Sequence, residues 1–161
     1  MPAKGEPSRL EAAKRDLATA LAGLKDGGRF NLVLYASDVW TWSDELVTMT
    51  SETRQEVAKA IEGLSASGGT NIYGALERAL DIAGAKGGGT WSKPEIDTIY
   101  FLTDGRPSIG LTRVPDEILA YVRERNSAAG IVIHTIGLSA AQEAAFLRRL
   151  AEENGGQYVA R

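Results

Sequence analysis

Hydrophobic residues recur every three or four positions in several stretches of this chain, a pattern typical of helices that bury one face. In the first such stretch, residues 8–25, the apolar positions are Leu10, Ala13, Leu17, Leu21 and Leu24. Ser8 and Glu11 stand at its start with the spacing of a capping box. The same periodicity predicts helices at 51–64 and 72–83, and we expect two more at about 114–128 and about 140–153.

Short runs that are almost wholly apolar lie between these helices. FNLVLYA (30–36) and IDTIYFLT (96–103) are typical of strands covered on both faces of a sheet. IVIHTIGL (131–138) and QYVA (157–160) predict two further strands. Ser37-Asp38 predicts a tight turn between 30–36 and VWTW (39–42), so we expect these two segments to form a hairpin.

Alternating strands and helices indicate βαβ units. We therefore predict an α/β fold with a doubly wound, mostly parallel sheet, helices on both faces and one antiparallel hairpin at the edge. The 161 residues are enough for a single domain with its own hydrophobic core.

Composition excludes several classes of function. The chain has no cysteine, which excludes disulfides, thiolate metal sites and a cysteine nucleophile. A net charge of −3 without a Lys/Arg cluster does not favour binding to nucleic acid. The apolar runs are far shorter than a membrane span, and MPAKGEPSR lacks the apolar stretch of a signal peptide.

Two segments carry the candidate chemistry, GGTNIYGALERAL (68–80) and IYFLTDGRPSIG (99–110). Ligands of doubly wound sheets lie beyond the carboxyl ends of the strands. Asp104 follows a strand at such an end, and Thr70 precedes a helix that should begin on the same edge. A hydroxyl, a carboxylate and free backbone N–H groups suit Mg²⁺, or a carboxylate bridged through it.

Five segments, taken in order, carry a resemblance to a known family. They are RFNLVLYASDVWTW (29–42), SGGTNIYGAL (67–76), FLTDGRPSIG (101–110), the stretch 126–137 with IHTIG, and FLRRLAEENGGQY (146–158). In this order and spacing the chain resembles the von Willebrand factor type A domain, in the version found in inter-alpha-trypsin-inhibitor heavy chains and bacterial relatives. The resemblance spans residues 8–161.

The resemblance implies an adhesion-type module that binds a protein partner through a Mg²⁺-dependent site and is not an enzyme. The family builds this site from an Asp-x-Ser-x-Ser loop, a threonine matched by Thr70 and an aspartate matched by Asp104. The partner often completes the magnesium shell with its own carboxylate. Asn71, Gly105 and Arg106 flank the matched positions and are the expected partner contacts, Arg106 as a charge that steers an acidic partner.

The chain departs from the family at the first metal loop. No aspartate is followed two positions later by serine, and the strand that should precede this loop is also missing. In the family the loop is usually followed by a methionine, so we hypothesise that Met1 is that residue and that 1–161 is a domain truncated at its N-terminus. Reading the coding DNA upstream of Met1 tests this hypothesis.

The missing strand is central in the family, and its loss leaves two open strand edges. Either segments 30–36 and 96–103 close up against each other, or a second copy of the chain fills the gap; we favour the dimer. One carboxylate and one hydroxyl make a poor magnesium cage, because the ion takes six oxygens. We therefore expect weak metal binding, or none, by this chain alone.

Two other functions remain as alternatives: a binding module that works without metal, and a small hydrolase or nucleotide-using enzyme of similar topology. Neither GK[ST] nor G-x-G-x-x-G is present, and Ser108 lacks a nucleophile-elbow motif. His134, the one histidine, is interpreted as a satisfied core residue. Trp40 and Trp42 share one face of a strand and should cover a helix or an edge.

Overall fold

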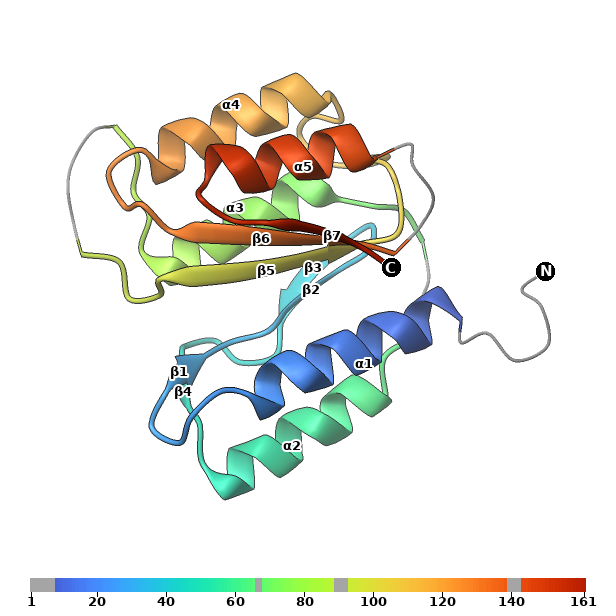
Figure 1. Cartoon of the computed structure of the whole chain (residues 1–161), viewed down its shortest axis with the longest axis vertical. Helices are drawn as coiled ribbons and strands as arrows, with labels where there is room; N and C mark the ends of the chain where they lie inside the picture. The colour runs from blue at the N-terminus through green and yellow to red at the C-terminus, as the bar shows by residue number, and fades with distance from the viewer. Residues whose placement is uncertain (1–7, 66–67, 89–92, 139–142) are drawn as a thin grey trace.

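The computed structural model describes residues 8–65, 68–88, 93–138 and 143–161, and it confirms the α/β fold (Figure 1). The helices are α1 (Arg9–Ala22), α2 (Ser51–Glu62), α3 (Ile72–Ala83), α4 (Pro115–Asn126) and α5 (Ala144–Glu153). The strands are β1 (Arg29–Phe30), β2 (Val33–Tyr35), β3 (Val39–Thr41), β4 (Val47–Thr48), β5 (Thr98–Thr103), β6 (Val132–Gly137) and β7 (Tyr158–Ala160).

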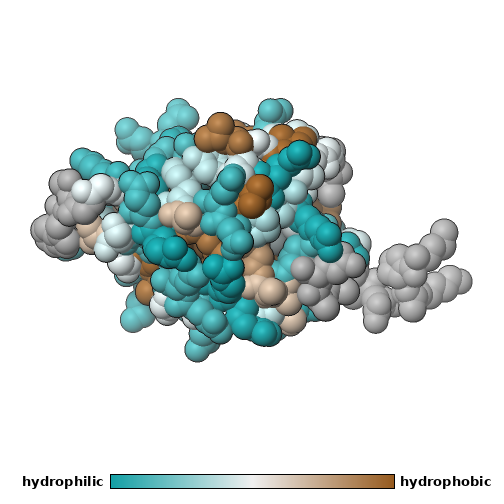
Figure 2. Space-filling model, turned by 90° about the horizontal axis from the view of Figure 1, so that it is seen from above, coloured by the Kyte–Doolittle hydropathy of each residue, from teal (hydrophilic) through white to brown (hydrophobic). Residues whose placement is uncertain are grey.

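Three parallel strands form the main sheet, in the order β5-β6-β7. Thr98 pairs with Val132 at one end of the β5–β6 ladder and Thr103 with Gly137 at the other. Helices α3, α4 and α5 cover one face of this sheet, while α1 and α2 lie on the opposite side of the molecule (Figure 1). The outer surface over α4 and α5 is largely hydrophilic with small, separate apolar spots (Figure 2).

The predicted continuous strand at 30–36 is wrong, because Asn31 interrupts it. β1 pairs with β4 and β2 pairs with β3 in two separate antiparallel ladders. The Asn31 side chain accepts from the backbone N–H groups of Leu32 and Ser43 and donates to the carbonyls of Ser43 and Glu45. These local bonds compete with the strand ladder at this point. The hairpin β2–β3 is present as predicted, with its turn closed by Ala36 N–H donating to the Asp38 carbonyl.

Strands β2 and β5 do not pair with each other, so the expectation that segments 30–36 and 96–103 pair directly is wrong. They belong to different sheets, and no backbone hydrogen bond joins them in the described part of the chain. A groove of about 440 Å³ lies between them, lined on its sides by α1 and α3. β5, expected as a central strand covered on both faces, is instead an edge strand.

The groove separates two hydrophobic clusters. The larger cluster joins α3, α4 and α5 to β5 and β6, and the smaller one gathers around Phe30, Met49 and Val57. Helix α1 begins with Ser8 as its N-cap, as predicted, and its leucines are only partly buried. Because much of the apolar face of α1 lines the groove, the helix buries no residue completely.

Two side-chain contacts span the groove, one at each end. The Tyr35 hydroxyl donates to the Leu102 carbonyl at 3.0 Å, and the Tyr35 ring stacks on Phe101 with centroids 5.8 Å apart. At the other end, Arg29 forms an ion pair with Glu95 at 3.2 Å. Arg29 precedes β2 in the chain and Glu95 precedes β5, whereas Tyr35 and Leu102 lie near the ends of these strands. The two strands therefore run in the same direction.

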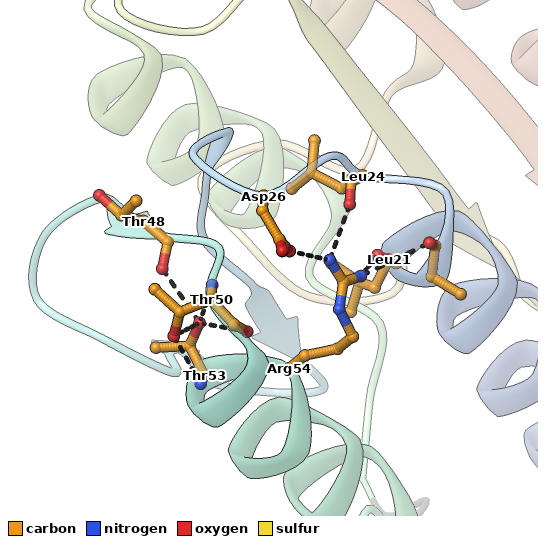
Figure 3. Close-up of polar contacts among 8 residues, drawn as sticks. Leu21, Leu24, Asp26, Thr48, Thr50, Thr53 and Arg54 are labelled. Atoms are coloured by element: carbon orange, nitrogen blue, oxygen red, sulfur yellow. Dashed lines mark hydrogen bonds and ion pairs between the residues drawn. The ribbon is translucent and has the colours of Figure 1, made fainter.

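Arg54 holds the two helices below the groove together (Figure 3). From α2, its guanidinium donates to the carbonyls of Leu21 and Leu24 at the end of α1, at 2.9 and 3.0 Å, and pairs with Asp26 at 2.8 Å. At the start of α2, Thr50 and Thr53 form a reciprocal capping box. Carbonyls at a helix C-terminus lack intrahelical partners, and Arg54 satisfies one of them.

Two aromatic predictions need refinement. The Nδ1 atom of His134 accepts from the Gln157 N–H and its ring stacks on Tyr100, so the histidine is satisfied but half-buried rather than in the core. Trp42 stacks on Phe30 in the smaller cluster, whereas Trp40 is 48% exposed.

Among the described residues, no helix is long and apolar enough to span a membrane.

We predict that Tyr35→Phe lowers the free energy of unfolding by about 1 kcal/mol at pH 8, because it removes the hydrogen bond across the groove. Burial raises the pKa of the Tyr35 hydroxyl above its usual range. Tyrosines of the unfolded chain ionise near pH 10, so stability falls as pH rises through this value. In the variant this fall is less steep by up to about 1.4 kcal/mol per pH unit.

Urea unfolding at pH 8, 10 and 11 measures both effects, with Tyr100→Phe as the control because Tyr100 is 56% exposed. Equal stabilities for Tyr35→Phe and Tyr100→Phe at all three pH values would contradict a role for the Tyr35 hydroxyl.

We predict that Arg54→Met lowers the free energy of unfolding by about 1.5–3 kcal/mol, because carbonyls of α1 lose a charged donor. Arg15→Met removes an exposed arginine on α1 and should change stability by less than about 0.5 kcal/mol. Chemical unfolding of both variants provides the comparison, and equal losses would show that Arg54 does not hold α1.

Candidate functional site

Three loops converge at the carboxyl edge of the sheet: residues 36–38 after β2, 68–71 before α3 and 103–109 after β5. The Asn71 N–H donates to the Ala36 carbonyl at 2.8 Å. The N–H of Ser108 donates to the Thr70 carbonyl at 3.0 Å. The loop before α3 is therefore held from both sides.

The structure places Thr70 against the turn that contains Asp104, as the sequence predicts. A Cβ atom added to Gly105 would lie 3.4 Å from the Thr70 hydroxyl oxygen. Thr103 is buried. Its hydroxyl donates to the Gly105 carbonyl at 3.3 Å and accepts from the Gly105 N–H at 3.4 Å. These contacts fix the turn on which Asp104 lies.

Asp104 is exposed, and the described part of the chain shows no hydrogen bond or ion pair to its carboxylate. Its negative charge contributes, after burial, to the raised pKa of Tyr35. The carboxylate is therefore exposed to solvent on the turn whose Gly105 lies next to the Thr70 hydroxyl.

The other predicted contact residues have structural partners of their own. Asn71 is the N-cap of α3: its Oδ1 accepts from Gly74 N–H at 2.9 Å and its Nδ2 donates to the Ser37 carbonyl. Arg106 donates from Nε to Glu143 at 2.7 Å, which ties the loop after β5 to the start of α5. Both side chains therefore shape the edge of the sheet, whatever further contacts they make.

Two serines hold the loop before α3, and sequence reasoning did not assign this role. The Ser37 hydroxyl accepts from the Gly69 N–H and the Ser108 hydroxyl accepts from the Thr70 N–H, both at 2.8 Å. Two consecutive backbone donors are thus satisfied by side chains from the two flanking loops. A Cβ atom at Gly69 would lie 2.3 Å from Cδ1 of Ile109, so the exposed Ile109 side chain would have to move to admit one.

An exposed apolar rim lies beyond this edge and was also missed. Ile109, Leu111 and Val114 are 40, 84 and 49% exposed. All three belong to the loop that follows Asp104, and Ile109 is in contact range of Gly69. The only available sequence signal was three bulky apolar residues in a segment without helix or strand periodicity.

The residues present do not by themselves fit a magnesium ion. Among the described residues, no group of three or more acidic or histidine side chains converges in a way that could hold a metal. Thr70 and Asp104 offer two side-chain oxygens, whereas Mg²⁺ takes six in near-octahedral geometry. The hydroxyls of Ser37 and Ser108 already accept backbone hydrogen bonds.

A sequence profile described as von Willebrand factor type A domain matches residues 2–160. The chain belongs to this family. Two curated relatives are similar to this domain: human von Willebrand factor A domain-containing protein 3A, 32% identical over 80% of the chain, and bovine inter-alpha-trypsin inhibitor heavy chain H3, 33% identical over 92%. The chain spans only 10% and 16% of these two proteins.

A solved von Willebrand factor type A structure from Catenulispora acidiphila superposes on 94% of the chain with a TM-score of 0.75. The two share 20% sequence identity, and the chain covers 34% of that protein, so this likeness supports the fold alone. Von Willebrand factor type A domains are typically protein-interaction modules. The fold and the family predicted from the sequence are thus confirmed.

We predict that Ser108→Ala and Ser37→Ala in this von Willebrand factor type A domain each lower the free energy of unfolding by about 1 kcal/mol. Ser108→Ala should speed hydrogen exchange of the Thr70 amide and leave that of Gly69 nearly unchanged. Ser37→Ala should do the reverse, so each variant is the control for the other. Equal effects on both amides would show that the serines do not act separately.

Proposed function

We propose that this domain binds a partner protein at the edge formed by Thr70, Asp104 and the apolar rim, and that it catalyses no reaction. The observation that carries the proposal is the Asp104 carboxylate, which has no partner among the described residues and lies on a fixed turn. The segment that follows it exposes three apolar side chains. Protein interfaces commonly combine an apolar centre with polar groups around it. The family supports the same conclusion, because its domains are typically interaction modules.

The loops of this edge are well suited to binding because they are already held in place. Ser37 and Ser108 satisfy the backbone donors before α3, and Thr103 fixes the turn at Gly105. Binding to such an edge orders few additional groups, which lowers the entropic cost of association. The exposed carboxylate of Asp104 favours a partner that brings a cation or a hydrogen-bond donor.

We further propose that the Mg²⁺ site of the family is incomplete in this chain. Thr70 and Asp104 would contribute a hydroxyl and a carboxylate, and water and a partner carboxylate would have to supply the remaining oxygens. An ion held by so few protein ligands binds weakly, because Mg²⁺ gives up its water reluctantly. The interaction therefore either works without metal or assembles the ion only together with the partner.

The geometry does not favour the hydrolase alternative. The Ser108 hydroxyl accepts from the Thr70 N–H, and the Nδ1 atom of His134 is taken up by the Gln157 N–H. A serine nucleophile needs a base within hydrogen-bond reach of its hydroxyl. Among the described residues, no such base bonds to Ser108.

Calorimetric titration of the chain with Mg²⁺ and with Mn²⁺ tests the incomplete site. We predict no binding tighter than about 1 mM, since two protein oxygens cannot replace the hydration shell. Asp104→Ala should behave like the unaltered chain, and Asp44→Ala, an exposed aspartate on another loop, is the control. Tight binding that Asp104→Ala abolishes and Asp44→Ala retains would contradict the proposal.

The partner surface can be tested without knowing the partner. A photo-reactive amino acid at position 111 should cross-link to protein in extracts of the source cells, whereas one at position 44 should not. Adding Asp104→Ala to the position-111 chain should reduce the cross-linked product. Equal cross-linking at positions 111 and 44 would contradict binding at this edge.

A further inference from the structure

Three acidic or amide side chains of this chain directly precede a glycine, at Asp26, Asp104 and Asn154. In such a pair the backbone nitrogen of the glycine can attack Cγ of the preceding residue, because glycine has no side chain to shield the nitrogen and its backbone is flexible. The sequence alone does not distinguish the three pairs. The structure does, through the hydrogen bonds that hold each of them.

The reaction needs a side chain that can turn back onto the next nitrogen, and a glycine N–H that can leave its acceptor. A bond forms between the nitrogen and Cγ, and the hydroxyl of the carboxyl group in its acid form leaves with the N–H hydrogen as water. For an asparagine the leaving molecule is ammonia. Water then opens the five-membered succinimide ring, and opening at the backbone carbonyl gives isoaspartate, whose main chain runs through Cβ and Cγ. No oxidant, reductant or further reactant takes part.

The pair Asp26-Gly27 is held at both reacting groups. The Gly27 N–H donates to the Met49 carbonyl at 2.9 Å, and the Asp26 carboxylate forms an ion pair with Arg54 at 2.8 Å. Arg54 also donates to carbonyls at the end of α1, which fixes its position. Ring closure here would have to break a backbone hydrogen bond and an ion pair together.

The pair Asn154-Gly155 is held at both ends of the side-chain amide and at the glycine N–H. The Asn154 side chain donates to the Leu150 carbonyl and accepts from Nδ2 of Asn126, both at 2.8 Å. The Gly155 N–H donates to the Glu152 carbonyl at 3.3 Å. The half-buried amide therefore cannot turn toward Gly155 without leaving both of its partners.

The pair Asp104-Gly105 has little of this restraint. The Asp104 side chain is exposed, and its carboxylate has no partner among the described residues. The Gly105 N–H donates to the Thr103 hydroxyl at 3.4 Å, which is long for a hydrogen bond. A Cβ atom built on Gly105 would meet the Thr70 hydroxyl oxygen at 3.4 Å, an ordinary van der Waals contact, so the surroundings leave room for a ring.

We propose that Asp104 isomerises to isoaspartate in the folded chain, faster than Asp26 or Asn154 reacts, and that the carboxyl edge of the sheet thereby changes as the protein ages. The product lengthens the main chain by one carbon within the turn that Thr103 holds, and it moves the carboxylate from the side chain to Cα. The consequence for binding rests on the proposed function, in which the Asp104 carboxylate is offered to the partner.

The reaction can be followed by keeping the folded chain at neutral pH and body temperature for several weeks in water enriched in the heavy isotope of oxygen. Each opening of the ring adds one heavy oxygen, and mass spectrometry of the digested chain locates it. Because the other two pairs must open locally before they react, we expect the label to enter Asp104 at least about tenfold faster than Asp26 or Asn154. An enzyme that methylates isoaspartate should modify the same peptide.

The chain unfolded in guanidinium separates the effect of structure from that of sequence. Without the restraints, Asn154 should react fastest, because a neutral amide is attacked more readily than a negatively charged carboxylate. In the folded chain, Gly105→Ala should slow labelling of Asp104 by at least about tenfold, since a methyl group then shields the nitrogen. Thr103→Val removes the acceptor of the Gly105 N–H and should speed it. Equal labelling of the three pairs in the folded chain, or faster labelling of Asn154, would overturn the proposal.

The consequence for binding has a separate readout. In chain aged until Asp104 is largely converted, cross-linking from position 111 should fall, as it does with Asp104→Ala. Unchanged cross-linking by the isomerised chain would contradict the role of Asp104 in the proposed function. The isomerisation itself is decided by the heavy-oxygen label, which needs no partner.

Discussion

The contact between Tyr35 and the β5 strand is the constraint on which the arrangement of this domain depends. The domain consists of two hydrophobic clusters, and no backbone ladder joins β2 to β5 in the described chain. Tyr35 bonds the Leu102 carbonyl and stacks on Phe101, so a side chain from one half fixes the position of the other. Because this hydroxyl also satisfies a carbonyl on an open strand edge, it replaces one hydrogen bond that a neighbouring strand would otherwise supply.

The candidate binding edge depends on the same constraint. Ser37 and Ala36 follow β2, but their partners Gly69 and Asn71 stand before α3, which belongs to the larger cluster. Any movement of β2 relative to β5 is therefore transmitted to the loop that carries Thr70.

The five helices and the strands β5, β6 and β7 could be predicted from local pattern: apolar residues recur at helical spacing in α1, α2 and α3, and Ser8 caps α1 as expected. The meeting of Thr70 with the Asp104 turn followed from the rule for parallel sheets. The break at Asn31 could not be foreseen, because it depends on carbonyls of Ser43 and Glu45 more than ten residues away. The roles of Ser37 and Ser108 likewise exist only after three loops have come together. Local hydrophobicity predicts that Leu111 is buried, whereas the tertiary fold leaves it exposed.

Hydrogen exchange along β5 in the unaltered chain is the most direct test of this account. The Asp97 and Thr103 carbonyls accept from Val132 and Leu138, so the odd-numbered residues of this segment face β6. The amides of Ile99 and Phe101 therefore point toward β6, whereas those of Tyr100 and Leu102 point into the groove. If the outer edge of β5 is open, the amides of Tyr100 and Leu102 should exchange at least about 100-fold faster than those of Ile99 and Phe101. Uniformly slow exchange along β5 would show that its outer edge is paired, and would contradict a domain whose halves are joined across an open groove by side chains.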